Sequence, residues 1–165
     1  MSKARVVIGI DPGTATTGYG LVRMNSHSEL EEVDYGVVTT PSDWEEPRRL
    51  LFIYHALREI VEKYQPESCA VENIFFQRNV RTAMRVGQGR GAALIAMATS
   101  NLPMGEYTPS EIKQAVVGYG NADKNQVQQM VKLLLDLDEI PQPDDAADAL
   151  AVAICHLHTS GNMTT

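Results

Sequence analysis

The chain of 165 residues is 44% hydrophobic and 21% charged, with a formal net charge of −7. This composition excludes a disordered or collagen-like chain, and the length predicts a single domain, residues 1–165, with a core of its own. We expect no secretory signal, no membrane partner and a cytoplasmic protein, because the apolar runs are far shorter than a bilayer span.

The first part of the chain predicts three strands and a helix. The β-branched run at residues 5–10 indicates a central strand, and Asp11-Pro12-Gly13 ends it with a turn. Residues 18–24 and 33–39 predict two further strands joined by a polar hairpin loop. Apolar residues in 50–64 recur at steps of three and four, which predicts an amphipathic helix.

The rest of the chain alternates strands with helices. Residues 68–71 predict a strand that ends at Glu72, and 104–107 predict another. A long helix is expected at 80–98, with Gly87-Gln88-Gly89 as its weak point. Further helices are expected at residues 109–117, 124–135 and 145–158. This order predicts an α/β fold with a five-stranded mixed sheet flanked by helices.

The cysteines and the late histidines do not indicate a metal site of their own. Cys69 and Cys155 lie in apolar surroundings outside any zinc-type spacing, so we expect free buried thiols in a reducing compartment. His156 and His158 are two residues apart and do not share a helix face, so we expect surface or internally bonded side chains rather than ligands.

Charge is distributed unevenly along the chain. The net charge alone argues against a nucleic-acid partner, yet residues 73–105 contain no acid and four arginines. Three of these, Arg78, Arg81 and Arg85, follow helical steps and predict one ridge that contacts phosphate. After residue 132 the chain contains no lysine or arginine, and its acidic residues crowd into positions 136–148. The alternative is a solvated helix face and an acidic loop.

Four carboxylates occupy positions that could bring them together. Asp11 and Glu72 each follow an apolar strand directly, where sheet-based sites tend to lie. Asp145 and Asp148 are three residues apart and share one helix face, and the alanines around them would let that helix lie close to a sheet. Taken singly, Asp11 could be a turn residue and Asp145 a helix N-cap.

If the four carboxylates converge, they require a cation, because so many negative charges cannot ionise side by side. Oxygen ligands alone favour Mg²⁺ or Mn²⁺ over zinc. Two such ions would suit phosphoryl chemistry, since one activates a water and the other stabilises the leaving oxygen.

The residues also resemble a known family. The first similar segments are Ile8-Gly9-Ile10-Asp11-Pro12-Gly13 and Thr17-Gly18-Tyr19-Gly20, which resemble the opening of that family's sequences. Further similar segments follow in the same order: Val71-Glu72-Asn73-Ile74-Phe75, Gly87-Gln88-Gly89-Arg90-Gly91, Lys113-Gln114-Ala115-Val116-Val117-Gly118 and Asp145-Ala146-Ala147-Asp148-Ala149-Leu150-Ala151. Together these motifs resemble the RuvC crossover-junction endonucleases over nearly the whole chain.

The resemblance implies a ribonuclease H-like fold and a homodimer that resolves Holliday junctions, four-way DNA junctions, in recombination and repair, leaving 5′-phosphate ends. It assigns metal binding to Asp11, Glu72, Asp145 and Asp148, a supporting catalytic role to Lys113 and Lys124, and base contact to Phe75. It also implies the branch-migration partners RuvA and RuvB. Asp144, beside the matched pair, leaves the ligand set open.

Three other functions remain possible from the sequence. A ribosomal-RNA-processing nuclease could share the fold, and a non-catalytic protein could bind junctions as a scaffold. Asp11-Pro12-Gly13-Thr14 also resembles the first phosphate motif of actin-like and sugar-kinase ATPases. The chain is short for the two-lobed cleft of such ATPases.

Overall fold

The computed structural model describes residues 4–73 and 79–161. A five-stranded sheet with the order β3-β2-β1-β4-β5 forms its centre. β1 (Arg5–Asp11), β2 (Thr16–Met24) and β3 (Leu30–Thr39) form an antiparallel meander, while β4 (Ser68–Glu72) and β5 (Met104–Tyr107) run parallel to β1. The predicted mixed sheet is confirmed.

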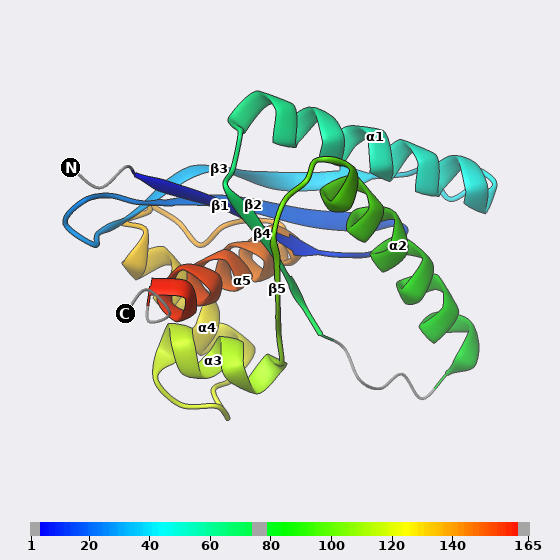
Figure 1. Ribbon diagram of the computed structural model, residues 1–165. Helices are drawn as coiled ribbons and strands as arrows, with labels where there is room; N and C mark the ends of the chain where they lie inside the picture. Colours follow the sequence, from blue (N-terminus) through cyan, green and yellow to red (C-terminus); the bar gives the residue numbers. More distant parts are fainter. Residues whose placement is uncertain (1–3, 74–78, 162–165) are drawn as a thin grey trace.

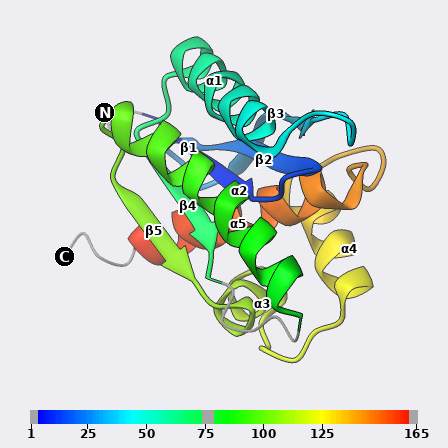
Figure 2. The ribbon, with the colours of Figure 1, turned by 90° about the vertical axis from the view of Figure 1, so that its right-hand side faces the viewer.

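Helices cover both faces of the sheet (Figure 1). α1 (Glu46–Tyr64) and α2 (Val80–Thr99) pack together on one face. α5 (Asp144–Gly161) lies across β1 and β2 on the other face, and α3 (Pro109–Val117) and α4 (Lys124–Leu134) pack against it. Each face has its own cluster of buried apolar side chains. Figure 2 shows α2 passing across the sheet, with α5 behind it.

Several elements extend beyond their predicted ends. β2 begins at Thr16 and β3 at Leu30, because backbone pairing continues into polar residues that the apolar pattern does not mark. α2 is continuous through its predicted weak point at Gly87–Gly89. A Cβ on Gly89 would lie 2.9 Å from the carbonyl carbon of Gly13, so this glycine serves close packing of α2 on the loop after β1.

Glycines also let α5 lie directly on the sheet. A Cβ on Gly9 would come within 2.2 Å of the Ala149 carbonyl oxygen, and one on Gly18 within 2.0 Å of the Asp145 carbonyl oxygen. On the helix side the residues in contact are small, as predicted, and Ala146 and Ala149 are fully buried. Because backbone meets backbone, the first turn of α5 sits over the end of β1.

The cysteines and histidines are as predicted. Cys69 and Cys155 are free and buried. The ring of His156 is hydrogen-bonded on both sides, with 2.8 Å from Nε2 to Ser68 Oγ and 2.7 Å from Nδ1 to Tyr107 Oη. Across the described ranges, the helices offer no stretch long and apolar enough to cross a bilayer.

Candidate active site

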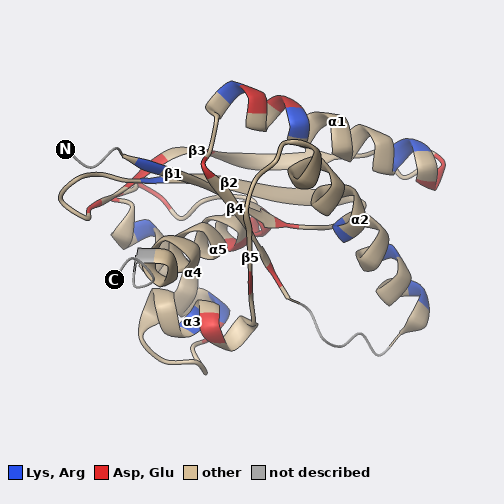
Figure 3. Ribbon diagram, viewed as in Figure 1, with Lys and Arg blue, Asp and Glu red and all other residues tan. Residues whose placement is uncertain are grey.

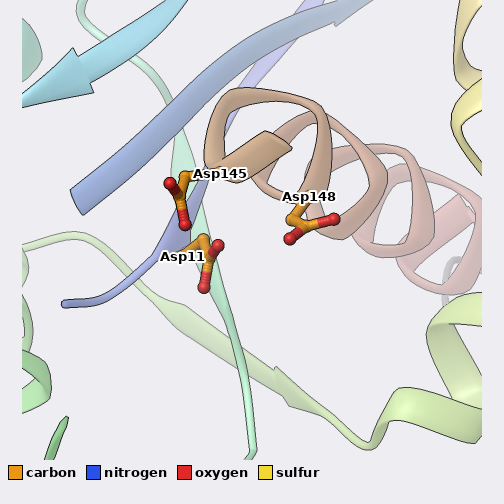
Figure 4. Close-up of side chains that lie close together, drawn as sticks. All are labelled: Asp11, Asp145 and Asp148. Carbon is orange, nitrogen blue, oxygen red and sulfur yellow. The ribbon is translucent and has the colours of Figure 1, made fainter. Parts of the chain in front are cut away.

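Three aspartates from two elements form a compact group (Figure 4). Asp11, Asp145 and Asp148 each offer a carboxylate oxygen, and these oxygens lie within 4.8 Å of one another. Asp11 is the last residue of β1, and the other two lie in the first turns of α5. Asp11 therefore ends a strand rather than serving only as a turn residue, and residues 134 positions apart in the chain meet.

Glu72 lies beside this group but not within it. β1 and β4 are parallel and align Ile10 with Val71, so Asp11 and Glu72 follow aligned residues on neighbouring strands. Glu72 lines a cavity of about 240 Å³ together with Asp148, Lys113 and Lys124. The structure thus brings three of the four predicted carboxylates into one group and places Glu72 on the adjoining wall.

Negative charge and burial raise the pKa values of these groups. Burial, followed by the charges of Asp148 and Asp145, raises the pKa of Asp11 from 3.8 to about 8. Burial raises the pKa of Asp148, and burial with the charge of Asp148 raises that of Glu72, although Lys113 opposes the latter shift. The site therefore favours either a bound proton or a bound cation at neutral pH.

The donor set fits a hard divalent cation. In the described part of the chain, the group consists only of carboxylates, with neither histidine nor cysteine among its members. Oxygen donors of this kind suit Mg²⁺ or Mn²⁺ rather than a softer metal. A divalent ion would also offset the repulsion that raises the pKa of Asp11. The group at the end of β1 thus has the donor set of a divalent-metal site.

Asp144 has a different environment from its neighbours. Its Oδ2 lies 3.1 Å from Lys124 Nζ, and its Oδ1 accepts a hydrogen bond from Gln128 Nε2 at 3.1 Å. Lys124 Nζ also lies 3.8 Å from Asp148 Oδ2. Asp144 therefore faces α4 and holds Lys124 near the aspartate group, a role that the sequence did not reveal.

Two of the predicted DNA-contacting residues, Arg81 and Arg85, lie in the first two turns of α2. Arg81 and Arg85 are exposed there, while Phe75 and Arg78 fall outside the described residues. Figure 3 shows basic segments and no acidic segment along α2. Arg90 differs from Arg81 and Arg85, because its guanidinium pairs with Glu106 at 2.9 Å.

The site also depends on three glycines that the sequence predicted only as parts of motifs, without a structural role. Gly9 on β1, with Gly18 and Gly20 on β2, forms the surface that receives α5. Glycines inside strands, two of them at the period-two spacing of one strand face, are a recognisable signal of close backbone approach.

Comparison with known proteins agrees with this architecture. The family model "Crossover junction endodeoxyribonuclease RuvC" matches residues 7–156. The protein of that description from Chloroflexus aurantiacus is 54% identical over 153 residues, which cover 93% of each chain. The one from Alkaliphilus oremlandii is 52% identical over 159 residues, covering 96% of each. The structure of T. thermophilus RuvC in complex with Holliday junction substrate matches with a TM-score of 0.92 and 36% identity, covering 97% of both chains.

The fold and the site together define a nuclease with a ribonuclease H-like fold. The family model spans most of the chain, and curated relatives exceed half identity. The chain therefore belongs to the RuvC family of crossover junction endodeoxyribonucleases.

The raised pKa of Asp11 predicts how the metal-free protein responds to pH. The folded chain keeps this proton up to about pH 8, whereas the unfolded chain loses it near the ordinary value of 3.8. Asp11 therefore contributes stability at low pH that is lost as the pH rises through this window, by roughly 1–3 kcal/mol given its coupling to neighbours.

Thermal unfolding in EDTA measures this effect. Burial lowers the pKa of His156, so the contribution of His156 to stability grows as the pH rises, opposite to that of Asp11. Wild type is therefore compared with Asp11→Asn, because both proteins contain His156. The quantity to compare is the melting temperature of Asp11→Asn minus that of wild type. This difference should be about 3–8 °C larger near pH 8 than near pH 5. An equal difference at both pH values would contradict a raised pKa of Asp11 in the folded protein.

Proposed function

We propose that this chain resolves Holliday junctions by divalent-metal-dependent hydrolysis of phosphodiester bonds. The observation that carries the proposal is the meeting of Asp11, Asp145 and Asp148 within 4.8 Å in a chain of this family. The junction substrate named for the matched T. thermophilus structure supports the choice of DNA. The proposal includes the end products, namely 5′-phosphate ends, and a role in recombination and repair.

Each acidic and basic side chain of the site has a proposed part. Asp11, Asp145 and Asp148, with Glu72 from the adjoining wall, would hold Mg²⁺, with Mn²⁺ as a substitute and two ions per site. Bound ions supply an activated water and stabilise the leaving oxygen. Lys124, held by Asp144, and Lys113 on the cavity wall would offset negative charge that develops on the phosphate.

The arginines at the start of α2 would hold the DNA. Arg81 and Arg85 are exposed on a helix without acidic residues, and Arg78 precedes them in the sequence at helical spacing. Contacts of this type position a duplex without reading its sequence. Phe75, between Glu72 and these arginines in the sequence, would contact bases at the junction centre.

We further propose that the protein acts as a homodimer through the outer face of α2. Met84 and Ile95 are 62% and 57% exposed. A Cβ added to Gly87 or Gly91 would meet nothing within 4 Å, so no described contact requires these helix-weakening glycines. A close second copy would explain both features, and two-fold symmetry would match paired cuts in a junction. Light scattering should give twice the chain mass, and a monomer would contradict this proposal.

Other parts of the proposal rest on family membership alone. We propose RuvA and RuvB as partners and the cytoplasm as the place of action, with residues 1–165 acting as a single nuclease domain. Free buried thiols at Cys69 and Cys155 are compatible with that reducing compartment.

A cleavage assay with a metal series tests the proposed function. The full chain is given a labelled synthetic four-way junction, a linear duplex of the same sequence and a structured RNA. We expect cutting of the junction alone, in Mg²⁺ or Mn²⁺ and not in EDTA. Cutting of the RNA would favour ribosomal-RNA processing, and tight junction binding without cutting would favour a scaffold. Turnover of ATP, measured in a separate assay, would favour an ATPase.

A further inference from the structure

A second, smaller cavity lies between the loop after β1 and the helices α1 and α2. It has a volume of about 190 Å³, and its walls are two arginines, two threonines and two apolar residues: Thr14, Ala15, Arg49, Thr82, Arg85 and Val86. It shares no lining residue with the cavity beside Glu72. We call it the Arg49 site.

Arg49 is the unusual member of this site. It is only 9% exposed and continues the buried stripe of α1 that includes Ile53, Leu57 and Val61. Within residues 4–73 and 79–161, no carboxylate oxygen lies within 4.0 Å of its guanidinium. A buried charge without a counter-charge is unfavourable, so the fold retains a positive group that an anion would stabilise.

Hydrogen bonds fix the position of this guanidinium. Arg49 Nε donates to Thr40 Oγ1 at 2.8 Å, and that hydroxyl donates to the Thr14 carbonyl oxygen at 2.6 Å. Thr14 Oγ1 in turn donates to the Arg85 carbonyl oxygen at 3.0 Å, which ties α2 to the same loop. The side chain of Arg85 remains exposed, so two arginines line one cavity whose frame is held by these hydrogen bonds.

We propose that the Arg49 site binds one phosphate of the junction strand, separate from the phosphate that is cut. This rests on the proposed function. Thr14 is three residues from Asp11, a span of at most about 11 Å. A neighbouring phosphate of a strand whose scissile phosphate lies at Asp11 is therefore within reach of the Arg49 site. Guanidinium groups suit this task because their fork of donors matches phosphate oxygens.

A matched pair of variants on the same turn of α1 tests the site. Arg49→Gln removes the buried charge, and Arg48→Gln removes an exposed one whose guanidinium lies 3.8 Å from the Trp44 ring centroid. Binding of a labelled four-way junction is measured in EDTA over a series of salt concentrations. Arg49→Gln should bind about tenfold more weakly and reduce the salt slope by about one, while Arg48→Gln stays within about twofold. Equal effects of the two substitutions would overturn the proposal.

A second measurement covers the case in which Arg49→Gln folds poorly. Single phosphates of the junction are replaced in turn by neutral methylphosphonates, and wild type is compared with Arg85→Gln, whose side chain is exposed. One position should weaken wild-type binding about tenfold and weaken the variant much less, since both changes remove the same contact. If the penalties match at every position, the Arg49 site does not hold a phosphate.

These results separate the two proposals. If wild type binds junctions through Arg49 but never cuts them, the proposed function is refuted and the proposal of a phosphate at the Arg49 site stands. Normal cutting, with equal junction affinity for Arg49→Gln and Arg48→Gln, would refute the Arg49 site alone.

Discussion

Replacing Asp11 with asparagine is expected to abolish junction cleavage while leaving junction binding intact. Asparagine keeps the size of the side chain but removes the charge at the centre of the aspartate group, where the three carboxylate oxygens lie within 4.8 Å. The variant would hold divalent ions poorly, and their contribution to the reaction is large. We expect the single-turnover rate constant to fall by at least about 10³-fold, with the dissociation constant for the junction unchanged or smaller.

Asp138→Asn is the matched control, because it makes the same chemical change at an exposed acid that is not part of the aspartate group. It should cut at the wild-type rate. The two variants are compared by single-turnover cleavage at saturating protein, with binding measured separately in EDTA. Wild-type cutting by Asp11→Asn would show that the reaction does not depend on this carboxylate, and loss of binding would show a role in holding DNA.

The order of elements could be predicted because it depends on local patterns. Apolar periodicity and turn residues mark each strand and helix within a few residues, and the structure contains every predicted element in the predicted order. Asp11 and Glu72 could be found for the same reason, since both follow short apolar runs. Their meeting with Asp145 and Asp148 was not deducible from spacing alone, because it depends on how α5 crosses the sheet.

The details of side-chain partners could not be predicted. Asp144 and Asp145 are adjacent acids in one sequence motif, yet one pairs with Lys124 and the other joins the aspartate group, because they point to different sides of α5. Arg49 gave a signal that is visible in retrospect: it occupies a position of the buried α1 stripe where an apolar residue is expected. Residues 74–78, which include Phe75 and Arg78, lie outside the described structure, so their roles stay predictions.

Replacing Gly18 with alanine is expected to disrupt both the fold and the site. The added Cβ would lie 2.0 Å from the carbonyl oxygen and 2.4 Å from the carbonyl carbon of Asp145. These are backbone atoms and cannot rotate away, so the first turn of α5 must move off the sheet. We expect a loss of about 3 kcal/mol in the free energy of unfolding, which lowers the melting temperature by about 6–12 °C.

The same movement separates Asp145 from Asp11, so cleavage should fall at least about tenfold even where the variant is fully folded. Gly36→Ala is the matched control on the neighbouring strand. Its Cβ would approach the Tyr19 hydroxyl at 2.8 Å, which is the far end of a side chain rather than backbone. That control should unfold and cut nearly as wild type does. If Gly18→Ala kept the wild-type melting temperature and cleavage rate, the aspartate group would not depend on close packing of α5 against β2.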